Sequence, residues 1–339
     1  MSETRLGHAL GALTGLAVGD ALGMPTQSLP RSVIRDRFGP RITAFEPAPP
    51  DHPIARGMAR GRVTDDTEQA LLLAQLWIDC QGHFDPYEWA RRLLAWEDRM
   101  RRQGSLDLLG PSTRHALSAL QAGESLEQTG RFGTTNGAAM RIAPIGVAVG
   151  AEPLPRLVDV VEEVSRITHN TGLAIAGAAA VAAVVSAGVD GALLHEAIEL
   201  AVRAAALGAA RGHWMAGADV ATRIQWAVSL AQRYGPTDEL LEILDRLVGT
   251  SVATQESIPA AFAVLAAFGD NLWEALGAAA SVGGDTDTIA ALVGAMGGAL
   301  WGVDALPQDA REIVIRVNQL ALEPLAQGLL ETRVSARGR

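Results

Sequence analysis

Glycines recur at every fourth position in the N-terminal part of the chain, at Gly7, Gly11, Gly15, Gly19 and Gly23. In an α-helix this spacing lays them along one ridge. Each glycine costs a helix interior up to about 1 kcal/mol relative to alanine. The close approach of another backbone usually compensates for such a cost, so we expect this helix to pack tightly against a partner. A second ridge with the same spacing is formed by Gly294, Gly298 and Gly302.

The composition indicates a helical protein. Of the 339 residues, 48% are hydrophobic but only 4% are aromatic, whereas β-rich folds depend on aromatic residues and Thr. No stretch repeats the alternation of strands and no linker separates two cores, which favours one all-α domain over residues 1–331. Residues 332–339 have no apolar pattern and are expected to form a disordered tail. Periodicity predicts helices over residues 70–78, 86–99, 112–122, 157–167, 172–188, 197–210, 218–232 and 286–300.

Charge and cysteine content argue against several classes of protein. A net charge of -10 disfavours binding to a nucleic acid duplex, whose phosphates require a basic surface. The single cysteine, Cys80, excludes an intramolecular disulfide framework and fits the reducing cytoplasm. Residues 9–18 are apolar but rich in glycine and are followed by no small-residue cleavage site, so no signal peptide is expected. Residues 172–189 are barely long enough to cross a bilayer, and we expect a buried core helix there and no membrane partner.

Two carboxylates lie in one of the most apolar parts of the sequence. Asp285 and Asp287 are surrounded by residues 275–303, which are otherwise almost all apolar, glycine, serine or threonine. Burying an unpaired carboxylate costs several kcal/mol, and two acids two positions apart disfavour each other's ionised form. A bound cation would satisfy both. The alternative is that Asp285 only caps the helix at residues 286–300, which leaves Asp287 and Thr288 unexplained.

A second acid pair repeats this pattern about 220 residues earlier. Asp65 and Asp66 lie between Thr64 and Thr67, directly before the helix predicted at residues 70–78. Capping by Thr64 or Asp65 accounts for one residue but does not predict two acid pairs in one chain. Oxygen ligands without His or Cys favour Mg²⁺, Mn²⁺ or Ca²⁺ over zinc. The two pairs together predict a two-metal centre.

Other motifs have alternative interpretations. Asp20, at the end of the glycine ridge, is either a buried polar tether or part of a site. Residues 28–62 contain six prolines and are predicted to be a long loop. Residues 133–146 are rich in small residues, whose backbone N–H groups could hold phosphate or whose size could serve helix packing. His169, at the end of the helix predicted at residues 157–167, is either a cap and core hydrogen-bonding residue or a site residue.

Together these motifs resemble the ADP-ribosylglycohydrolase superfamily, which includes the glycohydrolase that reactivates dinitrogenase reductase. The motifs that carry the resemblance are residues 19–23 (GDALG), 64–67 (TDDT), 136–141 (NGAAMR), 168–169 (TH) and 283–288 (GGDTDT). The resemblance implies a compact single-domain bundle of α-helices and a centre of two Mg²⁺ or Mn²⁺ ions. By motif match the metal ligands would be Thr64, Asp65, Asp66, Asp285, Asp287 and Thr288.

The same resemblance implies contacts to the substrate. Asn136, Gly137 and Ala138 would lie along the ligand's phosphates, with His169 near the ribose. Asp20 is a further candidate for substrate contact. One position departs from the family pattern, because members that cleave ADP-ribosyl bonds often carry Glu where this chain has Gln27. Glutamine can hydrogen-bond a ribose hydroxyl but cannot act as a general base.

The expected activity is hydrolysis of a ribosyl C1″ bond in ADP-ribosylated side chains or small ADP-ribosyl conjugates. Asp65 or Asp285 would accept a proton from the attacking water, with Gln27 as a further catalytic candidate. Three alternatives stay open: a nucleoside hydrolase with the same chemistry, a non-catalytic ADP-ribose-binding protein, and a two-metal phosphohydrolase. The sequence gives no indication of the oligomeric state.

Overall fold

The computed structural model describes residues 2–106 and 108–335, and helices account for all the regular structure in them. Three short helical turns, η1 (Met24–Thr26), η2 (Leu244–Val248) and η3 (Val303–Ala305), accompany the α-helices. The prediction of an all-α fold is confirmed. The α-helices are α1 (Glu3–Gly23), α2 (Arg31–Phe38), α3 (Asp65–Asp79), α4 (Pro86–Arg102), α5 (Pro111–Gln121), α6 (Leu126–Thr129), α7 (Gly137–Met140), α8 (Ala143–Ala148), α9 (Leu154–His169), α10 (Gly172–Val189), α11 (Leu194–Ala209), α12 (Val220–Tyr234), α13 (Asp238–Ile243), α14 (Thr254–Phe268), α15 (Leu272–Ala279), α16 (Thr286–Trp301), α17 (Gln308–Asn318) and α18 (Leu322–Ser335).

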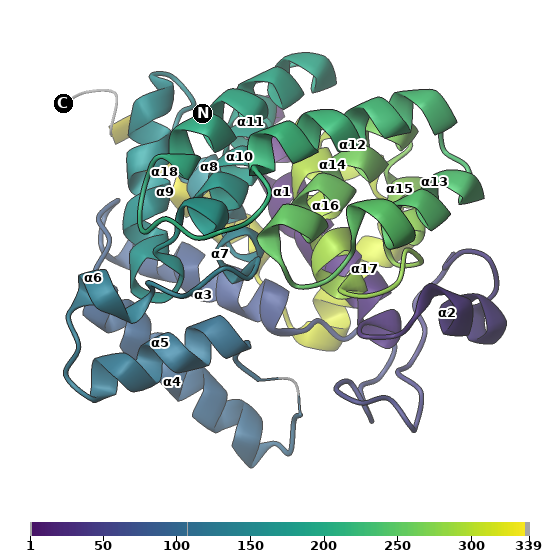
Figure 1. Cartoon of the computed structure of the whole chain (residues 1–339), viewed down its shortest axis with the longest axis horizontal. Coiled ribbons are helices and arrows are strands. Elements are labelled where there is room, and N and C mark those ends of the chain that lie inside the picture. Colours follow the sequence, from purple (N-terminus) through teal and green to yellow (C-terminus); the bar gives the residue numbers. More distant parts are fainter. Residues whose placement is uncertain (1, 107, 336–339) are drawn as a thin grey trace.

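The two glycine ridges pack against each other. Helices α1 and α16 lie together in the middle of the molecule (Figure 1). A Cβ atom added to Gly15 would lie 2.7 Å from the carbonyl carbon of Gly294, and one added to Gly11 would lie 2.7 Å from the carbonyl carbon of Gly302. Real Cβ atoms do not come so close to backbone, so only glycine allows this crossing. The predicted close approach of a second backbone is confirmed for the ridge, except at Gly7, which has no atom within 4 Å of an added Cβ.

Helix α10 is the most apolar helix of the core. It is the one helix in the described part of the chain that is long and apolar enough to cross a membrane, but 94% of that window is buried inside the protein. Its neighbours include α9, α11 and α16. The helix therefore serves as a core element, as its Ala and Gly content predicts. One hydrophobic cluster extends from Ala9 to Leu330.

The prediction of a loop over residues 28–62 is wrong in its first part, because α2 occupies Arg31–Phe38. Pro30 is the N-cap residue of this helix, where its missing N–H and fixed φ do no harm. Prolines at residues 40 and beyond stop the helix without disrupting it. The clustered prolines thus bracket a helix, and the rest of the segment is irregular.

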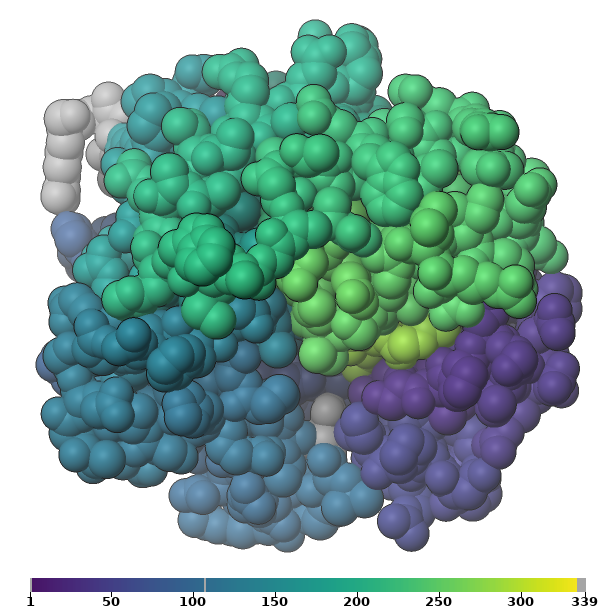
Figure 2. Space-filling model, in the orientation of Figure 1, coloured from purple at the N-terminus to yellow at the C-terminus, as the bar shows by residue number. Residues whose placement is uncertain are grey.

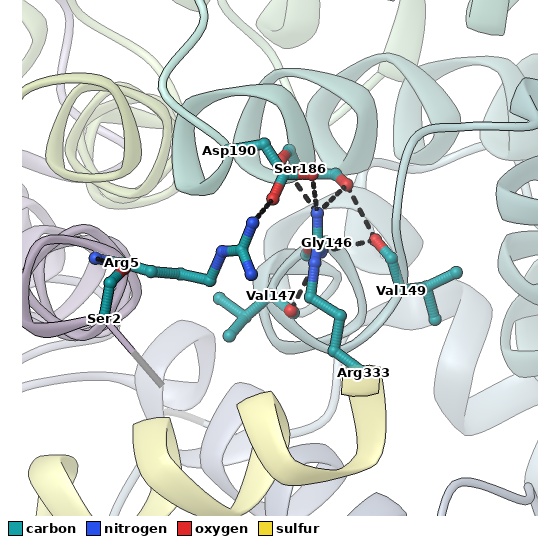
Figure 3. Close-up of polar contacts among 8 residues, drawn as sticks. All are labelled: Ser2, Arg5, Gly146, Val147, Val149, Ser186, Asp190 and Arg333. Carbon is teal, nitrogen blue, oxygen red and sulfur yellow. Dashed lines mark hydrogen bonds and ion pairs between the residues drawn. The ribbon is translucent and has the colours of Figure 1, made fainter. Parts of the chain in front are cut away.

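The chain end also differs from prediction, since α18 continues through Ser335 and the expected tail from residue 332 begins too early. Arg333 is only 2% exposed and reaches from the last turn of α18 into the core (Figure 3). The Asp190 carboxylate forms two ion pairs. Its Oδ2 lies 2.5 Å from Arg333 Nη2, and its Oδ1 lies 2.7 Å from Arg5 Nη2. Further acceptors of the Arg333 guanidinium include the carbonyl groups of Gly146, Val147, Val149 and Ser186 and the Ser186 hydroxyl. Residues 336–339 lie outside the described residues.

Candidate active site

A cavity of about 270 Å³ is lined by both acid pairs. Figure 2 shows a hollow where the N-terminal region, the α4–α5 region and the segment near residue 250 meet, and the cavity is lined from these same regions. The predicted site residues that line it are Gln27, Asp65, Asp66, Asn136, Gly137, Asp285, Asp287 and Thr288. A larger cavity of about 460 Å³, between α1, α17 and α18, is lined by none of them, so the chemistry places the site in the smaller cavity.

The first acid turn, residues 64–67, opens α3 and is held from inside the protein by Asp20. The Asp20 carboxylate accepts hydrogen bonds from the backbone N–H of Thr64, which lies 3.0 and 3.1 Å from its two oxygens, and from the backbone N–H of Thr67 at 3.1 Å. It also accepts a hydrogen bond from the Thr67 hydroxyl at 2.5 Å. Burial raises the pKa of Asp20 to about 6, although these hydrogen bonds act in the opposite direction. Asp20 is fully buried, is not among the residues that line the cavity, and positions the turn through these hydrogen bonds; its expected contact with the substrate stays a prediction.

The second acid turn, residues 283–288, depends on Gly283 and Gly284, whose φ angles of 92° and 72° are in the region that favours glycine. Asp285 is the N-cap residue of α16, but its side chain makes no capping hydrogen bond. Instead, its Oδ2 accepts the side-chain amide of Asn136 at 2.6 Å. Burial raises the pKa of Asp285, against the effect of this bond. Capping therefore does not account for Asp285.

The two acid turns meet at Asp66. Its Oδ2 accepts the hydroxyls of Thr64, at 3.4 Å, and of Thr288, at 3.3 Å. Its buried Oδ1 has no hydrogen-bond partner within the described residues. Burial first, and then the negative charges of Asp287 and Asp65, raise the pKa of Asp66 well above its usual range. A positive charge at this wall would stabilise the ionised carboxylates.

The residues fit a hard cation. The six expected ligands all offer carboxylate or hydroxyl oxygen, which Mg²⁺ and Mn²⁺ prefer. The unsatisfied Oδ1 of Asp66 points to the same chemistry. Among the described residues, no three Asp, Glu, His or Cys side chains already form a closed metal-binding cluster.

A buried arginine stands behind the first acid turn. Arg141 Nη1 donates to Gln69 Oε1 at 2.8 Å, and Gln69 Nε2 donates to Asp65 Oδ2 at 2.7 Å. Burial lowers the pKa of Arg141 to about 10, which leaves it cationic at neutral pH. The sequence interpretation missed Gln69 and assigned no role to Arg141. An arginine inside the apolar run of residues 138–145 was the signal that could have found it.

His169 lies behind the cavity wall, next to the lining residues Thr135 and Gly137. It is fully buried, and its Nε2 lies 3.0 Å from the Thr135 hydroxyl, which belongs to a lining residue. A Cβ added to Gly137 would lie 2.8 Å from the His169 ring, so glycine is required there. Burial, and then the charge of Arg141, lower the pKa of His169 well below its usual range. Ala138 is likewise buried outside the lining.

Two further donors face the cavity. Gln27 follows η1, is 5% exposed, and its Nε2 has no hydrogen-bond partner within the part of the chain that the structure describes. Helix α5 begins at the cavity with Gly110 as an N-cap residue that provides no side-chain cap. Pro111 has no N–H and the Arg114 N–H donates to the Gly110 carbonyl, so the backbone N–H groups of Ser112 and Thr113 are the ones available to an anion. Arg114, in the same first turn, also lines the cavity. The sequence interpretation expected phosphate near Asn136 and predicted the helix at residues 112–122, but it gave the start of that helix no role in the site.

Comparison with known proteins identifies the family. The chain matches the profile of the ADP-ribosylglycohydrolase family over residues 1–338. The chain belongs to the ADP-ribosylglycohydrolase family. The resemblance drawn from the motifs is thereby confirmed.

Some relatives of this chain carry the name of an activity and others do not. The uncharacterized protein YegU of Escherichia coli strain K12 is 35% identical over 326 residues, which is 96% of each chain. ADP-ribosylarginine hydrolase Tri1 of Pseudomonas putida strain GB-1 is 28% identical over 334 residues, covering 97% of this chain and 79% of the relative. A solved ADP-ribosylglycohydrolase-related protein complex matches with a TM-score of 0.71 at 27% identity, covering 98% and 99% of the two chains. The family and the fold therefore extend over the whole chain.

Proposed function

We propose that this protein is a metal-dependent hydrolase that cleaves the ribosyl C1″ bond of ADP-ribosylated side chains or small ADP-ribosyl conjugates. The observation that carries the proposal is that both acid turns line one cavity, with Asp65 and Asp66 from one and Asp285 and Asp287 from the other. Family membership and the activity named for the relative Tri1 support the substrate class. Cys80 is compatible with a cytoplasmic location, which is part of the proposal.

Two Mg²⁺ or Mn²⁺ ions fit the donors of the site. The residues that would hold them are Thr64, Asp65, Asp66, Asp285, Asp287 and Thr288. When bound, such ions supply Lewis acidity and neutralise the charge of the acid cluster. The protein's own part is to fix the carboxylates: Asp20 holds the first turn through Thr64 and Thr67, and Asn136 holds Asp285.

The remaining residues suggest how a substrate would be oriented. The free Nε2 of Gln27 can donate to a ribose hydroxyl, and the uncapped first turn of α5 can hold a phosphate, next to Arg114. Water would then attack C1″ while the bond to the leaving group breaks, and Asp65 or Asp285 would accept the proton of the water. Asp65 is oriented for this by Gln69 and Asp285 by Asn136.

Gln27 supports a second candidate, in which the same chemistry acts on a free nucleoside. An amide at this position can hydrogen-bond a ribose hydroxyl but carries no charge and cannot act as a base. The substrate therefore need not be one that requires an acid there. The cavity of about 270 Å³ is large enough for a nucleoside without a pyrophosphate. The α5 N-terminus and Arg114 favour the substrate that carries phosphates.

Product analysis separates these candidates. The protein is incubated with Mg²⁺ or Mn²⁺ and, separately, with ADP-ribosyl-arginine, ADP-ribosyl-serine and a panel of nucleosides, with EDTA as the control. We expect free ADP-ribose from at least one conjugate and no product with EDTA. Release of a free base without cleavage of any conjugate would establish the nucleoside hydrolase instead. Phosphate release would indicate a phosphohydrolase, and calorimetric binding of ADP-ribose without any turnover would indicate a binding protein.

A further inference from the structure

A second concave surface adjoins the first acid turn. We call it the arginine groove. It has a volume of about 310 Å³ and lies between the irregular segment at residues 56–64, the C-terminal half of α4 and residues 103–105. Val63 and Thr64 line the groove, whereas Asp65 and Asp66 line the candidate active site. The first acid turn is therefore the wall between the two.

The charge of the arginine groove is opposite to that of the whole chain. Arg56 is exposed and makes no ion pair with any described residue. The one acid in the lining, Glu68, already accepts the Trp96 indole N–H at 2.5 Å and lies 3.8 Å from Arg62 and 3.6 Å from Arg99. The lining therefore holds two guanidinium groups, Arg56 and Arg62, and one carboxylate, and Arg99 adds a third cation next to Glu68 from outside the lining, in a protein whose net charge is -10. The excess positive charge favours a negatively charged occupant.

The floor of the groove is apolar. Trp96 is 1% exposed, Val63 is 2% exposed and Met100 is 7% exposed, and Met58 lies at the side. Methionine side chains adapt to irregular partners, which suits a surface that binds polypeptide. Trp96 is too deeply buried to stack on a nucleic acid base, so the groove offers none of the aromatic platforms on which single strands bind. The combination of an apolar floor and basic rim fits an acidic peptide.

We infer that the arginine groove binds acidic residues next to the modified side chain of an ADP-ribosylated protein. This rests on the proposed function: the ribose would be held at the first acid turn, whose Thr64 also lines the groove, so a polypeptide attached at C1″ would start next to the groove. The protein would consequently act on conjugates in an acidic sequence context in preference to a basic one.

The test uses two ADP-ribosylated peptides that differ only at the residues around one modified arginine, with glutamates in one and lysines in the other. We expect the wild-type kcat/KM at low ionic strength to be at least about 10-fold higher for the glutamate peptide, mainly through KM, and this ratio to shrink towards one in 0.5 M NaCl. The double variant Arg56→Glu/Arg62→Glu should reverse the preference. Arg246→Glu, a change at an exposed arginine of η2, is the control and should keep the wild-type ratio.

Equal kcat/KM for the two peptides in the wild type, or an unchanged preference in the double variant, would overturn the inference. If the double variant does not fold, Arg56→Gln replaces it, because the exposed Arg56 supports no other described residue; the preference should then fall at least about two-fold, and an unchanged preference would refute the inference. An oligonucleotide of equal charge that competes as well as the glutamate peptide would also refute it.

The proposed function can fail separately, if ADP-ribosyl-arginine and both peptides are not cleaved. In that event, fluorescence anisotropy of the unmodified glutamate peptide tests the groove. Binding that the double variant weakens at least about 10-fold would support the groove alone, and no saturable binding up to about 1 mM would refute it.

Discussion

Replacing Gly15 by alanine tests the contact between α1 and α16. The added Cβ would come closest to the Gly294 carbonyl oxygen and would lie only 2.7 Å from the carbonyl carbon, whereas ordinary contact begins at 3.4 Å, so the helices must separate by more than about 0.7 Å. A gap of this size forfeits a quarter to a half of the dispersion energy of the contacts it opens. Overpacking of cores costs about 1–3 kcal/mol, and alanine returns up to about 1 kcal/mol of helix propensity. Because the added methyl group meets rigid backbone, its overpacking cost should be at the upper end of that range, and we expect a net loss of about 2 kcal/mol in the free energy of unfolding.

Gly7 provides the matched control in the same helix and on the same ridge. An added Cβ there meets no atom within 4 Å, so Gly7→Ala should change only the helix propensity and stabilise the protein by about 0.5–1 kcal/mol. Urea unfolding followed by circular dichroism at 222 nm measures both, through the midpoint at constant slope. The two substitutions should have opposite signs. A Gly15→Ala protein as stable as the wild type, or equal losses at both positions, would refute the account of the glycine ridge.

Three further predictions concern the site and the chain end. Asp287→Ala should abolish metal-dependent turnover while the helical circular dichroism spectrum stays unchanged; a lost spectrum would show that Asp287 is chiefly structural. Burial lowers the pKa of His169 in the folded protein, so below about pH 6.5 the unfolded chain binds a proton that the folded chain does not. The free energy of unfolding should therefore fall by up to about 1.4 kcal/mol per pH unit as the pH drops further. Urea unfolding at pH 7.5 and 5.5 should show a smaller loss in His169→Gln, and an equal loss in both proteins would contradict the assignment. Arg333→Met should lower the free energy of unfolding by about 2–4 kcal/mol, because it leaves buried carbonyl groups without a donor. The control Arg246→Met replaces a side chain that is 79% exposed and should change the free energy of unfolding by no more than about 0.5 kcal/mol. Equal effects of the two substitutions on the unfolding midpoint would argue against a structural role for Arg333.

The helical architecture could be predicted because local chemistry decides it. The helix expected at residues 286–300 is observed at Thr286–Trp301, after two glycines and with Gly302 as its stop. The helix expected at residues 172–188 is observed at Gly172–Val189. The failures occur where tertiary contacts override composition: α2 forms between prolines, and residues 332–335 are helical because Arg333 finds partners in distant segments.

The site was predictable only as a set of residue types. The acid pairs could be recognised because carboxylates in apolar sequence need a partner, and the structure brings both pairs to one cavity, where a cation would neutralise them together. The direction of a side chain depends on packing that no local pattern records. Asp20 and His169 therefore lie behind the wall, although their motifs adjoin it, and Gln69 reaches Asp65 from one turn along α3.

Both acid turns depend on the last turn of α1. Asp20 holds the first turn, and Thr286 of the second turn donates its hydroxyl to the Gly23 carbonyl at 3.0 Å, across a separation of 263 residues. At a translation rate of about 5–20 residues per second, α1 waits about 13–53 s for this partner. During that time its glycine face has no helix to cover it and the cavity lacks one wall. A ribosome-bound chain should therefore acquire its site only near the end of synthesis, and its early half should depend on chaperones in the meantime.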